Sequence, residues 1–249
     1  MWRQISAFFI KFAYQKKTNF VFVYNSRLMI KSEVFAFLNE LKNHNNKEWF
    51  DANRERYEST RSEFKIFTEN LLQNCMQFDA DLKGLEVKNC LFRINRDVRF
   101  SQNKDPYKIN YALSLTKGGK KTFYAGYYFH LQPGECFAGG GIYGPQPDIL
   151  KAVRNEIYFH YSEFESILSE KKFRKHYSGL DKIEMLKNPP KGFADDSPAM
   201  EYLKHKHFVI STRFTDHQIQ AKTFLSEITE KFEALHPFIA FLNRAVDNR

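Results

Sequence analysis

The stretch that decides the fold is YALSLTKGGKKTFYAGYYFHLQPGECFAGGGIY, residues 111–143. It contains three segments with the composition of β-strands, and a glycine-containing turn follows each of the first two. The segments are Tyr111 to Thr116, Thr122 to Leu131 and Cys136 to Tyr143, and the turns are KGGK at 117–120 and QPGE at 132–135. Consecutive hairpins place neighbouring strands antiparallel, so this stretch predicts an antiparallel meander.

Apolar residues at helical spacing flank the meander on both sides. Ser32 is a plausible cap for the first helix, and Asn46 is placed to cap one long helix or two abutting helices that end near Phe78. After the meander the pattern predicts one strand, Phe208 to Arg213, and helices at 147–157, 163–169, 198–204 and 216–246, the last kinked at Pro237. Helices around one mainly antiparallel sheet make an α+β fold, which we expect to form a single domain over residues 29–249.

The first 28 residues differ from the rest of the chain because they hold five basic residues and no acidic ones. Removing these five charges from the net +9 leaves +4 from Met29 onward, which is a weak electrostatic signal for nucleic-acid binding. The segment fits neither a secretory signal nor an organelle transit peptide. Helical patterning begins directly after Met29, so we expect Met29 to be the natural start and residues 1–28 to be a non-native or disordered extension.

Composition narrows the class of protein further. The 26 Phe and 13 Tyr fit a Phe-packed core, or alternatively a base-stacking surface if they alternate with basic residues on an exposed sheet face. No stretch has the length of a membrane span. Cys75, Cys90 and Cys136 are widely spaced, which predicts neither a disulfide framework nor a zinc knuckle and favours a reducing cytoplasm.

The run LFRINRDVRFS, residues 91–101, is the strongest indication of a site. It alternates like a strand, which would put Arg93, Asp97 and Arg99 on one face together with Asn95. Arginine beside a core needs a carboxylate, phosphate or carbonyl partner, so Arg93 and Arg99 are candidate anion ligands. Asp97 would orient an arginine or act as an acid or base. Arg96 falls on the apolar face, which favours a structural role for it.

Tyr128 and His130 lie on the polar face of the strand predicted at 122–131, with Thr122, Tyr124 and Gly126. If this face and the arginine face point the same way, the sheet presents guanidinium, phenol and imidazole groups together, and Tyr128 and His130 become candidates for proton transfer. The alternative is a structural network in which Asp97 ties the arginines to helix carboxylates such as Glu48, Asp51 or Glu55.

Two neighbouring segments extend the candidate site. In the loop KDPYK, residues 104–108, Lys108 could neutralise a phosphate and Tyr107 could flank it, although a plain polar turn explains the same residues. Gly139, Gly140 and Gly141 permit close backbone approach or a nest of amide donors, the alternative being a bulge or bend at the sheet edge.

Other signatures of chemistry are missing from the sequence. The eight His residues form no H-E-x-x-H, and His205 and His207 lack a third ligand nearby, so we expect no metal. Phosphate-binding glycine loops and the G-x-S-x-G nucleophile motif do not occur, and we expect no cofactor.

Several motifs together resemble a family that is widespread in bacteria, also occurs in fungi and is catalogued as domain of unknown function 2461. The motifs are Asn45-Asn46-x-Glu48-Trp49-Phe50, Phe92-Arg93-Ile94-x-Arg96-Asp97-x-Arg99-Phe100-Ser101, Lys104-x-Pro106-Tyr107-Lys108, Tyr127-Tyr128-Phe129-His130-Leu131-x-Pro133-Gly134, Gly139-Gly140-Gly141-x-Tyr143 and Pro190-Lys191-Gly192-Phe193. The resemblance runs from about Met29 to Ala245 and implies that Met29 is close to the usual start. Ser197 stands where the family has histidine and Asp105 where it has threonine; if that histidine were catalytic, this copy would be impaired. The family name implies no activity.

The resulting hypothesis is a cytoplasmic protein that binds or acts on a small anionic ligand, such as a phosphorylated molecule. Arg93, Arg99 and Lys108 would hold the anion, with Tyr107 beside it, and Gly139 to Gly141 would supply backbone donors. A nucleic-acid-associated protein that stacks bases on Tyr124 and Tyr128 is the competing hypothesis, and a non-catalytic scaffold is the third. The sequence predicts no membrane partner and does not predict an oligomeric state.

Overall fold

The structure is a computed structural model that describes residues 29–249, so the expectations for residues 1–28 lie outside the described residues. The helices are α2 (Ser32–Asn43), α3 (Lys47–Ala52), α4 (Arg54–Cys75), η2 (Ala80–Leu82, a 3-10 helix), α5 (Val87–Cys90), α6 (Pro147–Phe159), α7 (Tyr161–Ser169), α8 (Lys171–Arg174), α9 (Met200–Leu203), α10 (Asp216–Ile219) and α11 (Phe224–Asp247). The strands are β1 (Tyr111–Thr116), β2 (Gly126–Leu131), β3 (Phe137–Ile142) and β4 (Phe208–Arg213).

The four strands form one antiparallel sheet in the order β1-β2-β3-β4, which confirms the predicted meander and the α+β class. Strand β4 follows a long helical excursion and returns to pair beside β3, with Phe137 opposite Arg213 and Ile142 opposite Phe208. Asn46 caps α3 as predicted, because its side-chain oxygen accepts a hydrogen bond from the Trp49 amide at 2.9 Å.

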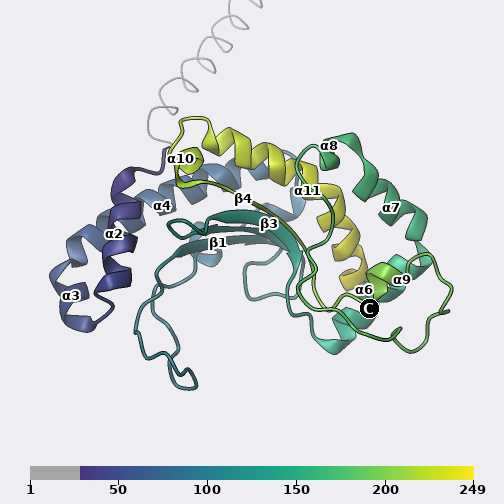
Figure 1. Ribbon diagram of the computed structural model, residues 1–249. Helices are drawn as coiled ribbons and strands as arrows, with labels where there is room; N and C mark the ends of the chain where they lie inside the picture. The colour runs from purple at the N-terminus through teal and green to yellow at the C-terminus, as the bar shows by residue number, and fades with distance from the viewer. Residues whose placement is uncertain (1–28) are drawn as a thin grey trace, which may run out of the picture.

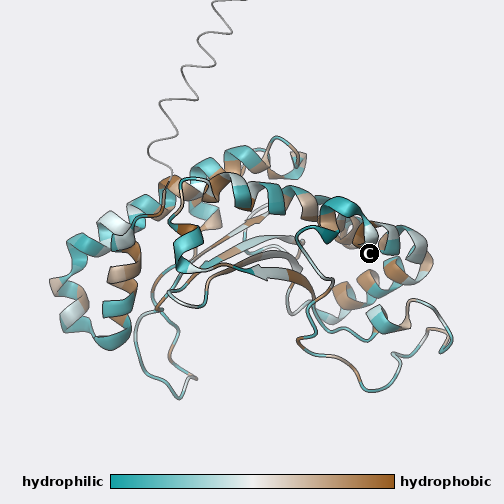
Figure 2. Cartoon of the chain, turned by 45° about the horizontal axis from the view of Figure 1, so that its top comes forward, coloured by the Kyte–Doolittle hydropathy of each residue, from teal (hydrophilic) through white to brown (hydrophobic). Residues whose placement is uncertain are grey.

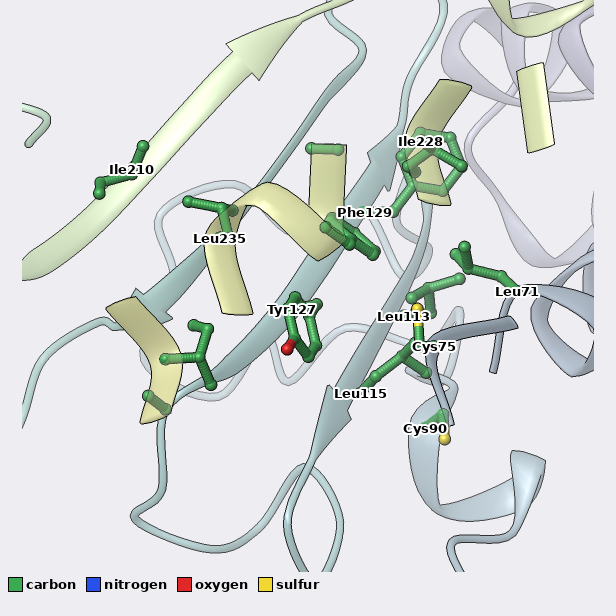
Figure 3. Packing of buried hydrophobic residues seen from close by; sticks show 14 of the residues in the cluster. Leu71, Cys75, Cys90, Leu113, Leu115, Tyr127, Phe129, Ile210, Ile228 and Leu235 are labelled. Carbon is green, nitrogen blue, oxygen red and sulfur yellow. The ribbon is translucent and has the colours of Figure 1, made fainter. Parts of the chain in front are cut away.

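One face of the sheet forms the core with helices α4 and α11 (Figure 1). Alternate residues of each strand point to this side, and they pack against Leu71 and Cys75 of α4 and against Ile228 and Leu235 of α11 (Figure 3). Tyr127 and Phe129 are fully buried there. Burial of an aromatic or aliphatic side chain stabilises the fold by roughly 1.5–3 kcal/mol, so this face supplies much of the stability.

The other side of the sheet, called here the open face, has no helix across it in the described part of the chain. Two irregular segments, 91–110 and 178–199, descend beside it, and hydrophilic residues dominate both of them (Figures 1 and 2). The strand register brings these open-face residues together: Ser114 and Thr116 of β1, Gly126, Tyr128 and His130 of β2, Phe137, Gly139 and Gly141 of β3, and Val209, Ser211 and Arg213 of β4.

The strand predicted at Leu91 to Arg99 is wrong, because this run belongs to an irregular loop that extends to residue 110. Isolated bridges join Leu91 to Leu113 and Asn95 to Tyr107, and no continuous ladder forms. The Asn45 side chain anchors the loop by bonding the Tyr107 amide at 3.1 Å and the Tyr107 carbonyl at 2.9 Å. The alternation of apolar and polar residues therefore arises from a loop that packs against the protein on one side only. Ile94 is buried on that side, and Arg93 is exposed on the other.

The second predicted strand is shorter than expected. It begins at Gly126, because Thr122 and Tyr124 belong to the connection from β1. Thr122 donates its hydroxyl to the Lys117 carbonyl at 2.7 Å, and the Tyr124 hydroxyl donates to Asp247 at 2.7 Å. Both side chains therefore lie on this connection and not on β2, and from there they still border the open side of the sheet. Within residues 29–249, no helix is both long and apolar enough to cross a bilayer.

Candidate functional site

The open face forms the floor of a cavity of about 1030 Å³. All four strands contribute to it, and its walls come from Phe92, the β1–β2 connection, the loop after β3 and residues 181–183. This volume is in the range of small-molecule sites in proteins, roughly 300–1,000 Å³. The cavity is therefore the first place to look for a ligand.

Positive charges outnumber negative ones around this cavity. Among residues 29–249, the charged side chains that line it are Lys120, Lys182 and Arg213 and one carboxylate, Asp181. Asp181 already accepts a hydrogen bond from the Ser211 hydroxyl at 2.6 Å, and Lys182 pairs with Glu201 at 3.3 Å. Arg213 has no carboxylate within 4.0 Å in the described residues, and its side chain is exposed. Its guanidinium is thus the most available anion-binding group of the cavity.

Tyr128 and His130 form a hydrogen-bonded pair beside the floor, as the predicted strand parity required. The phenol oxygen of Tyr128 lies 3.1 Å from Nδ1 of His130, and Nε2 of His130 lies 3.5 Å from Oε1 of Gln132. The Gln132 oxygen can only accept, so we assign the ring proton to Nε2, which leaves Nδ1 to accept from the phenol. The amide nitrogen of Asn110, 3.4 Å from Nδ1, fits the same tautomer.

Burial sets the protonation of this pair. It lowers the pKa of His130 below the ordinary value of 6.5, and nearby Lys108 adds to that effect. Burial also raises the pKa of Tyr128 above its ordinary value. At neutral pH a neutral imidazole therefore faces a protonated phenol, an arrangement that can pass a proton to or from a bound molecule.

The three glycines of β3 require a correction. A bulge or bend at the sheet edge does not explain Gly139 to Gly141, because β3 is a central strand with continuous register on both sides. Antiparallel ladders on both sides use the strand's amides, so these glycines do not form a nest of free donors. A Cβ at Gly139 would lie 2.0 Å from the Ile210 carbonyl oxygen, so close approach of β3 and β4 accounts for glycine there.

Gly139 and Gly141 nevertheless belong to the cavity, because they form its floor together with Gly126. We call these three residues the glycine floor. Gly140 lies between them on the opposite, helix-facing side, where a Cβ would meet Ile239 at 3.0 Å. The glycines therefore contribute open space rather than hydrogen bonds.

Arg93, Asp97 and Arg99 are not among the residues that line the cavity, whereas Tyr128 is. Arg99 binds Asp97 at 2.9 and 2.7 Å on the exposed part of the loop, and the Arg99 guanidinium lowers the pKa of Asp97. The alternative of a structural network is met only in part: Asp97 pairs with Arg99, but among residues 29–249 no arginine of this loop pairs with Glu48, Asp51 or Glu55, and Asp51 pairs with Lys47 and Arg54 instead. Ligand binding by Arg93 and Arg99 stays a prediction.

Lys108 and Tyr107 lie in different environments. Tyr107 is buried and stacks on Phe50 with ring centroids 3.9 Å apart, so it anchors the loop instead of flanking a ligand. Lys108 is half-buried, and its ammonium lies 5.6 Å from the centre of the Phe92 ring, beside the cavity. Burial lowers the pKa of Lys108, and the charges of Arg93 and Arg61 lower it further. An anion placed there would relieve this repulsion.

The sequence-based prediction missed Arg213, Ser211 and Asp181. Ser211 and Arg213 alternate on a segment that was correctly predicted as a strand, so their shared face was available as a signal. That this strand pairs with β3, and thereby faces Tyr128, depends on long-range contacts. No group of three or more His, Cys, Asp or Glu suited to a metal ion occurs among residues 29–249.

Comparison with known proteins gives one match. A family model described as "Conserved hypothetical protein (DUF2461)" matches residues 33–241. No curated protein and no solved structure matches the chain.

Proposed function

Because the chain belongs to the DUF2461 family of conserved hypothetical proteins, whose description carries no activity, we propose a function from the site: the protein binds a small anionic ligand on the open face of its sheet. The observation that carries the proposal is the charge of the cavity, in which three cations accompany one hydrogen-bonded carboxylate. Arg213 would bind the anion directly, and Lys108 would add positive charge from the Phe92 side.

The Tyr128–His130 pair gives this binding site a means of proton transfer. Tyr128 lines the cavity, and His130 lies directly behind its hydroxyl group. If the ligand undergoes a reaction, we propose that the Tyr128 hydroxyl accepts a proton from it while the phenol proton passes to Nδ1 of His130, which becomes an imidazolium until the proton is returned along the same path. We place this function in the cytoplasm, because the three cysteines are free and buried, as suits a reducing compartment.

Replacing Arg213 tests the proposal. We expect a panel of inorganic phosphate, ribose 5-phosphate and citrate to contain at least one anion that raises the melting temperature of the protein. Arg213→Ala should weaken that anion's binding by roughly 10- to 100-fold, the range for loss of a charge-assisted hydrogen bond. Isothermal titration calorimetry measures the change in Kd.

Arg99→Ala is the matched control, because Arg99 is an exposed arginine that pairs with Asp97 away from the cavity. It should leave the Kd unchanged. If Arg99→Ala weakened binding and Arg213→Ala did not, the ligand would sit on the loop and the proposed location would be wrong. If no anion bound the wild-type protein, the proposed function itself would fail.

A further inference from the structure

A row of aromatic rings crosses the open face beside the glycine floor. Phe92, Tyr128 and Phe137 all line the cavity and are half-buried, so their rings are partly available to a ligand. The centroid of Tyr128 lies 6.0 Å from that of Phe92 and 5.7 Å from that of Phe137. Such rings offer stacking faces and edges to another planar ring.

A cation stands at each end of this row. The Lys108 ammonium lies 5.6 Å from the Phe92 ring centre, and Arg213 is the register partner of Phe137 on the neighbouring strand. A ligand that extends along the row therefore meets apolar ring surface in its middle and positive charge at its ends.

The glycine floor adds flat space to the row. Gly126 and Gly141 are register partners, and Gly139 lies opposite Tyr128, so the floor spans two strands directly beside the rings. Polar groups border it: Ser114 and Thr116 on β1, and Ser211 with Asp181 on the β4 side. A planar molecule can lie on bare backbone there while its edges reach hydroxyl and carboxylate groups.

We infer that the anionic ligand is a nucleotide, with a heterocyclic base that packs against Phe137 and Tyr128 over the glycine floor and a phosphate that binds Arg213. This inference rests on the proposed function and specifies its ligand class. Stacking on the aromatic row accounts for the base, and the cations at its ends account for the phosphate. Phosphate alone would leave the rings and the floor unused.

Calorimetric titration of the full chain with four kinds of ligand tests the inference. They are a set of nucleoside 5′-monophosphates, ribose 5-phosphate, inorganic phosphate and a single-stranded oligonucleotide of about ten nucleotides. We expect at least one monophosphate to bind roughly 10-fold or more tightly than ribose 5-phosphate, since base–aromatic stacking contributes that much or more. Phe137→Leu should remove this advantage and leave the affinity for ribose 5-phosphate unchanged. Arg213→Ala should weaken every phosphate-bearing ligand.

Phe159→Leu is the matched control, because Phe159 is 74% exposed on α6 and is not part of the cavity lining. It should change none of the affinities. If Phe137→Leu does not fold, as judged by its melting curve, Tyr128→Leu replaces it with the same expectation, because Tyr128 is the other ring on which the base packs.

Three results would overturn the inference in distinguishable ways. If ribose 5-phosphate or inorganic phosphate bound as tightly as every nucleotide, the anion site would stand without a base site. If no ligand bound at all, the proposed function would fail together with the inference. If the oligonucleotide bound much more tightly than any monophosphate, with affinity falling steeply as salt rises, the open face would be a nucleic-acid surface instead.

Discussion

Replacement of Gly141 by alanine is expected to destabilise the protein severely, by about 3 kcal/mol or more. Gly141 has φ +129°, a conformation that residues with a side chain rarely adopt. A Cβ there would also lie 1.9 Å from the Phe208 carbonyl oxygen, which belongs to the backbone of the paired strand β4. That oxygen cannot move without breaking the β3–β4 ladder. Chemical denaturation followed by circular dichroism measures the loss.

Gly134→Ala provides the comparison. Gly134 also has positive φ, +77°, but a Cβ there would meet no atom within 4 Å. Backbone strain alone should then cost about 1 kcal/mol. Equal losses in the two variants would contradict the claim that close contact between β3 and β4 requires glycine at position 141.

The fold was predictable because its signals are local. The two hairpin connections, the strand at β4, the Asn46 cap and the apolar spacing of the helices each depend on a few neighbouring residues, and the structure confirms them. Two local predictions are wrong: Lys31, not Ser32, is at the N-cap position of α2, and the helix predicted at 216–246 is divided into α10 and α11. The strand predicted at Leu91 to Arg99 failed for the same reason. Its local pattern is strand-like, but the chain diverges from β1 beyond Phe92, and Asn45 holds the loop from another element. The alternation of apolar and polar residues along the loop does not reveal this contact with a distant residue.

The candidate site was predictable only in part, because a cavity joins residues that are far apart in the sequence. Tyr128 and His130 share a face by strand geometry alone, and in the structure the Tyr128 hydroxyl oxygen lies 3.1 Å from Nδ1 of His130. Arg213 reaches the same face only because β4 pairs with β3. The arginine-rich run at residues 93–99 was predicted to form the site. Among the described residues, however, the arginine that lines the cavity is Arg213, at the end of β4.

A second polar network, on the helix-facing side of the sheet, carries the other large expected effect. Asp79 is buried, with 5% of its surface exposed, and accepts hydrogen bonds from the Tyr127 hydroxyl at 2.9 Å and from the Asp81 amide at 3.0 Å. Nδ1 of His236 lies 3.1 Å from the same hydroxyl and 3.6 Å from the carboxylate. Because the single phenol proton goes to Asp79, His236 is placed to donate to the phenol oxygen.

Asp79→Ala should lower the free energy of unfolding by about 2–3 kcal/mol at pH 7, because it leaves the Tyr127 hydroxyl and the Asp81 amide without their acceptor. Urea denaturation measures this loss. Asp97→Ala is the control, since Asp97 is an exposed carboxylate whose partner, Arg99, is exposed too. It should change the stability little, because exposed ion pairs contribute little. A comparable loss in both variants would show that the Asp79 network does not stabilise the fold.

The contribution of Asp79 to stability should also depend on pH. The direction of this dependence follows from the groups that contact the carboxylate. Burial alone would raise the pKa of Asp79, but the nearby His236 ring and the hydrogen bond from Tyr127 outweigh burial, and the pKa lies below the ordinary value of 3.8. A carboxyl whose pKa is lower in the folded state stabilises the fold fully above the unfolded value, and this stabilisation is lost as the pH falls through the folded value. The stability difference between the wild type and Asp79→Asn should therefore shrink as the pH falls below about pH 4. Tyr127→Phe, which removes one of these bonds, should move the acid limb of the unfolding curve to higher pH, whereas a difference that grew on acidification would mean that Asp79 is protonated in the folded protein.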